Sequence, residues 1–529
     1  MRWLAMMTLG LSLTVGAAQA ADDLAFSSIA ELQARMTKGN LTAEALTQAY
    51  LDRIATLDRK GPKLNSIIAL NTHALFDARA LDKERRAGHV RGPLHGVPIL
   101  LKDNIESADD TATTAGSLAL KDNVTNRDAP LVKRLTDAGA VILGKTNLSE
   151  WANFRSTNSI SGWSAVGGLV RNPYGLDRSA CGSSAGTGAA IAAGLAGGGI
   201  GTETDGSIVC PAAINGLVGL KPTVGLVSRS RIVPISASQD TAGPMTRNVA
   251  DAAALLSALA GSDPADPATV QADSHRTNYL AALDTNALKG ARIGILRINA
   301  GRSPQADDVF AETLKTLKAA GAVLVEVKPP NLDAINAAEQ IVLRVEFKAG
   351  LNKYLATTSA KKVKVRTLKA LINFNNNESR EMVLFGQEIF TASQAAPGLD
   401  DPAYRKALET GKRLAGPEGI DAMLAADRLD ALIAWSGPSG IVDPVNGTRF
   451  VSPPSTLSAV AGYPHLTVPM GYVSGLPVGL SFMGPAWSEA RLLSLGYAYE
   501  QLTKARRNPT FPAKAGEYPD IAAAYDPPR

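Results

Sequence analysis

The chain has 529 residues, of which 45% are hydrophobic, 19% are charged and 5% are aromatic, and its formal net charge at pH 7 is +5. This composition is typical of a globular protein rather than a disordered one, and the small basic excess, without basic stretches that carry aromatic residues, argues against a nucleic-acid partner. The only two cysteines, Cys181 and Cys210, are too few for a disulfide-rich scaffold or a CxxC zinc site.

The first twenty residues predict an export signal. Arg2 is followed by an uncharged, mostly apolar run, and Ala18-Gln19-Ala20 has the small-x-small pattern of a signal-peptidase site. The apolar run is too short to span a bilayer of about 30 Å comfortably, and no stop-transfer flank follows it. We therefore expect a signal peptide over residues 1–20, a periplasmic or secreted mature chain over 21–529, and no stable membrane insertion after cleavage.

The hydrophobic pattern predicts an α/β protein. Residues 27–57 favour two helices, with Ser27 or Ser28 and then Thr42 as N-caps. From about residue 93, short apolar runs typical of buried strands alternate with amphipathic segments typical of helices. Strands are expected at 97–102, 140–145, 291–296, 322–327, 431–435, 465–470 and 477–483, and helices at 130–139, 305–320 and 489–504. We expect a single large domain with a mixed central β-sheet flanked by α-helices, in which residues 335–430 form a mostly helical elaboration.

Metal and glycosidase chemistry are poorly supported by the sequence. The five histidines are scattered and show no HExxH spacing, so no metal is expected; they lie at positions 73, 89, 95, 275 and 465. Glu203 and Asp205 would share one face of a strand, whereas the paired carboxylates of a glycosidase normally come from separate elements that face a cleft.

A serine hydrolase of the α/β-hydrolase class is one alternative. GSSAG at 182–186 fits the G-x-S-x-G pattern, which would make Ser184 the nucleophile of an esterase with His275 or His465 as its base. That turn needs a strand directly before the serine, and the preceding residues 172–181 are instead expected to form a polar loop. A second alternative is an exported binding protein without catalytic activity, which holds a carboxylate or phosphate in the glycine-rich segment.

Lys102 is a candidate base because it ends the apolar run VPILL. A buried ammonium is disfavoured, so burial favours the neutral amine. The pKa of the side chain would have to fall by about 3 units from about 10.4 to make the amine largely neutral near pH 7. Lys102 could equally be a strand-end residue that reaches solvent, so the residue alone does not decide its role.

Three stretches together resemble the successive motifs of the amidase signature family of serine hydrolases. They are GPLHGVPILLKDN at 92–104, CGSSAG at 181–186 and GTETDGSIVCP at 201–211. The similarity continues in KTNLSEWA at 145–152, GLVGLKPTVGLVS at 216–228 and QDTAGPMTRNVADAA at 239–253, and it spans most of the mature chain. It implies a mixed central sheet flanked by helices, a signature core at about 92–255, and hydrolysis of carboxylic amides without a cofactor.

Position by position, the resemblance makes Ser207 the nucleophile, Ser183 a bridging serine and Lys102 the base. Lys102 would accept a proton from Ser183, which in turn takes one from Ser207, so that no histidine is needed. The family's bridging serine follows a cis peptide bond, here Gly182–Ser183. The implied oxyanion hole consists of backbone N–H groups, those of Thr204, Asp205, Gly206 and Ser207.

The sequence departs from the family pattern at three positions beside these residues. Glu203 stands where aspartate is usual, Val209 where arginine is usual, and Ala185 where glycine or serine is usual. None of the three removes a catalytic atom, but the Asp–Arg ion pair often found behind the nucleophile cannot form. Cys181 and Cys210 would flank the implied site, either as a disulfide or as two buried thiols.

The version TETDGSIVCPAA, with NLSEWANFRS and SGWS upstream, is most similar to the bacterial peptide amidases within this family. The resemblance implies removal of the C-terminal amide of peptides with release of ammonia; a broad amidase for small aliphatic or aryl amides is the alternative within the family. Substrate contacts are expected from Trp151, Ala152 and Asn153 and from loops around residues 163 and 335–400. The oligomeric state is left open.

Overall fold

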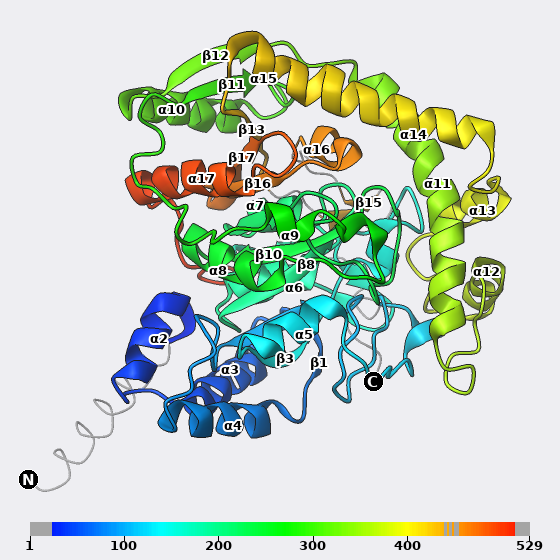
Figure 1. The fold of residues 1–529 in the computed structure, drawn as a ribbon. Helices are drawn as coiled ribbons and strands as arrows, with labels where there is room; N and C mark the ends of the chain where they lie inside the picture. The colour runs from blue at the N-terminus through cyan, green and yellow to red at the C-terminus, as the bar shows by residue number, and fades with distance from the viewer. Residues whose placement is uncertain (1–23, 439–441, 444–446, 449–453, 514–529) are drawn as a thin grey trace, which may run out of the picture.

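The computed structural model describes residues 24–438, 442–443, 447–448 and 454–513 (Figure 1). The predicted signal peptide, residues 1–20, lies outside these ranges. Within the ranges, no helix combines the length and the apolar character that crossing a membrane requires.

A mixed sheet of eleven strands, counted over the described residues, forms the centre of the fold. In spatial order the strands are β1 (Ile67–Leu70), β3 (Val141–Thr146), β2 (Pro98–Lys102), β8 (Gly198–Glu203), β10 (Thr241–Thr246), β9 (Val218–Lys221), β16 (His465–Val473), β17 (Leu476–Met483), β13 (Ala431–Ser436), β11 (Arg292–Leu296) and β12 (Val323–Val327). Strands β3, β2 and β8 are parallel, as are β13, β11 and β12, and the other neighbours are antiparallel. The predicted large mixed sheet is therefore confirmed.

Helices pack on both faces of this sheet. One apolar cluster joins the sheet to α5 (Pro130–Asp137), α8 (Val249–Leu259), α10 (Pro304–Ala319) and α17 (Glu489–Thr503). Another joins it to α3 (Ala43–Leu57), α4 (Ala74–Arg86), α6 (Ala185–Ala192) and α7 (Val209–Ile214). Along β2, Ile99 and Leu101 belong to the first cluster and Leu100 to the second. Because successive side chains of a strand point to opposite faces, the two clusters lie on opposite sides of the sheet.

A run of helices connects β12 to β13. It comprises α11 (Leu332–Thr357), α12 (Leu368–Asn377), α13 (Glu388–Ala395), α14 (Pro402–Ala415) and α15 (Ala422–Asp427). Figure 1 shows α11 along one side of the molecule, with α12 and α13 beside it. The remaining helices and small two-stranded sheets are α2 (Ile29–Thr37), α9 (Ala272–His275), α16 (Thr456–Ala461), β4 (Trp163–Ser164) with β5 (Gly168–Leu169), β6 (Arg171–Asn172) with β7 (Gly175–Ser179), and β14 (Val442–Asp443) with β15 (Gly447–Thr448).

The predicted helix starts are confirmed in detail. Ser28 caps α2 in a reciprocal arrangement with Glu31, and the hydroxyl of Thr42 accepts from the N–H of Ala45 at the start of α3. The expectation of a loop before Ser184 is wrong in part, because β6 and β7 form a hairpin there. That hairpin lies outside the central sheet, so it is not the strand that an α/β-hydrolase nucleophile requires.

Candidate active site

Lys102 is the last residue of β2, and its side chain is completely buried. Its Nζ lies 2.7 Å from Ser183 Oγ, 2.8 Å from Thr202 Oγ1 and 3.2 Å from the carbonyl oxygen of Thr202. Asn104 donates to the same Thr202 hydroxyl at 2.9 Å and so holds it in place. The alternative in which Lys102 reaches solvent is therefore wrong.

Burial lowers the pKa of Lys102 from its ordinary value to about 7, against the opposing charges of Asp240 and Glu203. A neutral amine has two N–H donors and one lone pair. The two donors can be used by the hydroxyl and the carbonyl oxygen of Thr202, which leaves the lone pair for the hydroxyl proton of Ser183. The contacts of Lys102 therefore suit a base that takes a proton from Ser183.

The two adjacent serines of the CGSSAG motif point to different partners. Ser183 follows a cis peptide bond from Gly182, as the resemblance implies, and its hydroxyl meets Lys102. The hydroxyl of Ser184 donates instead to the carbonyl oxygen of Thr202 at 3.1 Å. The described geometry thus distinguishes Ser183 from Ser184.

Neither histidine of the α/β-hydrolase alternative is placed beside Ser184. His275 is exposed and stacks on Trp487, with 4.2 Å between the ring centroids. His465 is buried on β16, and burial together with the nearby charge of Lys221 lowers its pKa to about 3. Within the described ranges the ring nitrogens of His465 have no hydrogen-bond partner, so no triad centred on Ser184 is formed.

Ser207 lies in a cavity of about 330 Å³ together with the loop that precedes it. Thr204, Asp205 and Gly206 line the same cavity, and Gly206 has a φ of +79°, a conformation that favours glycine. Within the described part of the chain, the backbone N–H groups of residues 204–207 make no turn or loop hydrogen bond to a backbone carbonyl. Backbone donors in a loop that lines a cavity are suited to a developing negative charge.

The side chains of this loop are tied to neighbouring elements. Thr204 Oγ1 donates to Asp240 at 2.6 Å, and Asp205 accepts from Thr456 Oγ1 at 2.7 Å. Glu203 Oε2 accepts from the N–H groups of Ile208 and Val209, at 2.7 and 3.0 Å. Glu203 therefore fixes the start of α7 directly after Ser207. Because Glu203 and Asp205 have these structural contacts, the glycosidase reading of the two acids finds no support.

A disulfide joins Cys181 to Cys210. Cys181 precedes the Gly182–Ser183 peptide, and Cys210 lies in the first turn of α7, so the bridge ties the two serine-bearing segments together. Both cysteines line the cavity. The N–H of Ser184 also donates to the carbonyl oxygen of Ser207 at 3.2 Å. Between Ser183 Oγ and Ser207 Oγ themselves, no hydrogen bond is present in the described residues.

The segment expected to contact substrate has an unusual backbone. Trp151, Ala152 and Asn153 have φ values of +49°, +54° and +68°, all in the left-handed region that non-glycine residues rarely adopt. Ala152 and Asn153 line the cavity. Trp151 lies instead in the adjoining apolar cluster, edge-to-face against Phe390 of α13.

Helix α11 contributes residues to the cavity that the motifs do not contain. Leu343 lines it, and Glu339 lies against Asp205. Glu339 accepts from Gln239 at 2.8 Å, and Asp205 Oδ1 has no other partner among the described residues. Two buried carboxyl groups in contact do not both ionise. Burial and the adjacent Asp205 charge raise the pKa of Glu339. Glu339 is therefore the group that stays protonated, and its O–H donates a hydrogen bond to Asp205.

Several further site residues were not singled out from the sequence. Thr202 and Asp240 lie inside the motifs at 201–211 and 239–253, so the motifs could have identified them as site residues. Glu339 and Leu343 lie within the segment 335–400 that was expected to contact substrate through loops; the first part of that segment is instead helical, as part of α11, and no local pattern marks the two residues individually. Within the described residues, no cluster of three or more histidine, cysteine or acidic side chains could hold a metal ion.

Comparisons with known proteins identify the family of the chain. The family model described as Amidase matches residues 45–493. A "probable amidase" of Arabidopsis thaliana is 39% identical over 497 residues, which cover 92% of this chain and 91% of the relative.

Two solved structures are more similar still. The native peptide amidase from Stenotrophomonas maltophilia is 56% identical and superposes with a TM-score of 0.87, covering 92% of this chain and 98% of that one. A peptide amidase in complex with the competitive inhibitor chymostatin, also 56% identical, superposes with a TM-score of 0.88 and covers 91% and 99% of the two chains.

Proposed function

The chain belongs to the amidase family and is an amide hydrolase, and from this premise we propose that it removes the C-terminal amide of peptides through an acyl-enzyme on Ser207. The observation that carries the proposal is the 2.7 Å contact between Lys102 Nζ and Ser183 Oγ in a fully buried setting. That contact supplies a base and a bridging hydroxyl without a histidine.

In the proposed reaction, Ser207 Oγ attacks the amide carbonyl carbon. Its proton passes to Ser183, while the proton of Ser183 passes to the neutral amine of Lys102. The C–N bond then breaks, and the amide nitrogen leaves as ammonia after it receives a proton back through Ser183. Water next attacks the acyl carbon while its proton passes through Ser183 to Lys102. The bond between that carbon and Ser207 Oγ then breaks, Ser207 regains a proton through Ser183, and the carboxylic acid is released.

The negative charge of the tetrahedral intermediate is stabilised by the backbone N–H groups of residues 204–207. Loss of one such donor typically costs about 3–4 kcal/mol of transition-state stabilisation. The loop is held by side-chain contacts rather than by the Asp–Arg pair usual in the family. Glu203 stands where aspartate is usual and helps to hold the loop in place, because it accepts from the N–H groups of Ile208 and Val209.

The peptide-amide substrate is supported by the 56% identity to peptide amidases over nearly the whole of both chains. The cavity at Ser207 is lined by side chains that can contact an acyl chain, among them Asn153, Phe154 and Leu343.

We further propose that the enzyme is exported and that the mature chain starts at Ala21. N-terminal sequencing of the protein from the periplasm or the culture medium tests this, and a chain that starts at residue 1 in the cytoplasm would contradict it.

Ammonia release from a panel of peptide amides, fatty amides and small aryl amides tests the substrate class. Peptide amides should give the highest kcat/KM; preference for a small aryl amide would favour the broad amidase while leaving the relay intact. Ser207→Ala should abolish release, and Ser183→Ala and Lys102→Ala should lower it by orders of magnitude.

Ser184→Ala is the matched control, because this neighbouring hydroxyl points to a backbone carbonyl. It should retain most of the activity, and so should His275→Ala. If Ser184→Ala is inactive while Ser207→Ala is active, the relay is wrong and the esterase mechanism is favoured.

A further inference from the structure

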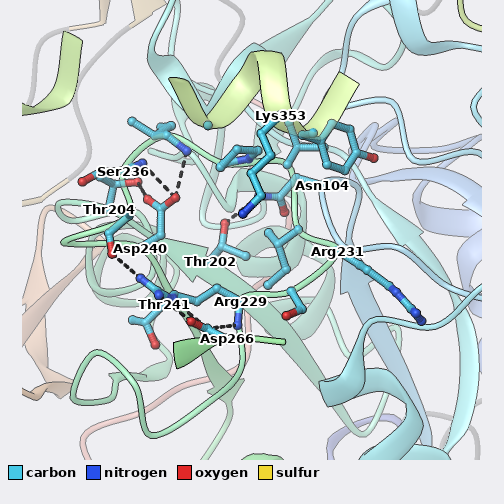
Figure 2. Close-up of a pocket in the computed structure, with 18 of the residues that line it drawn as sticks. Asn104, Thr202, Thr204, Arg229, Arg231, Ser236, Asp240, Thr241, Asp266 and Lys353 are labelled. Atoms are coloured by element: carbon cyan, nitrogen blue, oxygen red, sulfur yellow. Dashed lines mark hydrogen bonds and ion pairs between the residues drawn. The ribbon is translucent and has the colours of Figure 1, made fainter. Parts of the chain in front are cut away.

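A second, larger cavity of about 480 Å³ lies beside the one that contains Ser207. The two share Ala152, Thr204 and Ile235 in their walls. The larger cavity also reaches Thr202, which accepts from Lys102 Nζ, and Asn104, which donates to Thr202, so it lies next to the proposed relay. Figure 2 shows this space, with α11 above it and the segment around residues 229–241 along its wall.

Most charged groups in this wall are already neutralised within the protein. Arg229 makes two hydrogen bonds to Asp266, at 2.9 and 2.6 Å. Arg127 pairs in the same way with Glu106, at 2.6 and 2.9 Å. Asp240 accepts from Thr204 and from two backbone N–H groups. The two arginines therefore have their counter-charge within the protein, and the oxygens of Asp240 have hydrogen-bond donors.

Lys353 is different. Figure 2 shows its side chain extending from α11 into the cavity. Within the described residues it has no carboxylate partner and no hydrogen bond. Arg231 also lines the cavity, but Figure 2 shows it running away from the other labelled side chains, and its guanidinium donates to the carbonyl oxygen of Asp128 at 2.6 Å. Among the described residues that line the cavity, Lys353 is thus an exposed, inward-directed cation that no carboxylate contacts.

The rest of the wall is apolar enough to hold a carbon chain. Ile232, Val233, Pro234, Ile235 and Tyr354 line it. When the leaving group is ammonia, the volume required on that side of the scissile bond is small, so a cavity of this size suits the acyl part of the substrate. An apolar chain that ends in a negative charge would contact these side chains and place the charge at Lys353.

We propose that this cavity binds the acyl portion of the substrate and that Lys353 selects acyl groups with a carboxylate, such as peptide amides with a glutamate side chain near the scissile amide. The inference rests on the proposed peptide-amidase function and names the substrate class within it. Lys353 is a specificity-determining residue and takes no part in the relay.

Matched peptide amides test the proposal. Two series of N-acetylated tripeptide amides carry either glutamate or glutamine at the first, second or third residue from the amide, with alanine elsewhere. The wild-type kcat/KM for ammonia release should favour glutamate about threefold to fivefold at one position, the upper part of the range for an exposed ion pair. The preference should decrease at high salt, because screening weakens such pairs.

Lys353→Ala should remove the glutamate preference and Lys353→Glu should invert it, with little change for the glutamine series. Arg344 supplies the control: it is exposed on the same helix, lies nine residues away and therefore on the opposite face, and does not line the cavity. Arg344→Ala and Arg344→Glu change the net charge equally and should leave the preference intact.

The inference is overturned if wild type treats the two series alike, if Lys353→Ala keeps the preference, or if Arg344→Ala removes it to the same extent. If neither series releases ammonia, the proposed function fails and takes the inference with it. Equal release from both series overturns only the inference.

Discussion

The pH dependence of ammonia release is the sharpest test of Lys102 as the base. Its pKa of about 7 follows from complete burial, against an ordinary value of 10.5. The neutral amine is the active form, so the rate should rise with pH. We expect kcat/KM to be half-maximal near pH 7 and to fall to about a tenth of its plateau at pH 6, one unit below the pKa. A lysine with its ordinary pKa would be neutral in only about one molecule in 3000 at pH 7.

Asp240 provides a second test of the pKa of Lys102 in the same pH profile. Its negative charge raises the pKa of Lys102, and burial raises its own pKa to about 6. Below pH 6 the protonation of Asp240 should therefore make the acidic side of the profile shallower. In Asp240→Asn the opposing charge is absent, so the midpoint should move to lower pH, even if the altered loop lowers the plateau.

The assay is initial-rate ammonia release from a neutral peptide amide between pH 5 and 9, with circular dichroism at each pH to show that the protein stays folded. A rate that does not change over this range would refute the assignment of Lys102 as a base that titrates near neutrality. A midpoint that is unchanged in Asp240→Asn would refute the electrostatic account of its pKa.

Two further predictions concern the support of the nucleophile loop. Glu339→Gln keeps a hydrogen-bond donor to Asp205 but cannot ionise, so it should stay active at pH 7 and lose any activity decrease above about pH 8 that wild type shows. Glu339→Ala should lower kcat/KM about tenfold, since it removes one hydrogen-bond donor from the buried Asp205 carboxylate, which keeps its bond from Thr456. An alkaline decrease that persists in Glu339→Gln argues against the shared proton. The Cys181→Ser, Cys210→Ser double variant, which opens a loop with a sequence separation of 29, should lose about 3–4 kcal/mol of unfolding free energy. Urea unfolding measures this, and an unchanged free energy would mean that the bridge does not constrain the unfolded chain.

The sequence predicts best where local physics and the final fold agree. The apolar run before Lys102 became a buried strand, and Ser28 and Thr42 cap the helices that their spacing indicated. Strand β8 was not predicted, because glycines normally weaken strands. Packing explains it: a Cβ at Gly199 would come within 2.6 Å of the side chain of Thr187 on α6. Only a strand with so little side-chain volume lets α6 approach the sheet this closely.

The active site likewise contains residues that the sequence identifies and residues that only the folded structure identifies. Lys102 and Ser183 are marked by their motifs, and the structure brings them into contact. Glu339 and Lys353 could not be identified, because acidic and basic residues on a surface helix are common and only the tertiary fold shows what they face. The disulfide was likewise undecided, since two cysteines near one site fit a bridge or two free thiols until the chain is folded.

Helix α11 has a consequence for how such an enzyme could be diversified. Glu339 and Leu343 belong to the surroundings of the nucleophile, and Gly350, Lys353 and Thr357 to the larger cavity. At 1.5 Å per residue, these positions extend over about 27 Å of one helix. Combinatorial libraries at positions 343, 350, 353 and 357 would therefore vary the acyl-binding wall independently of the strand that holds Lys102 and the loop that holds Ser207. New amide specificities should be obtainable by recombining the part of this helix from residue 343 onward between homologues, while Glu339 and the hydrolytic core are left untouched.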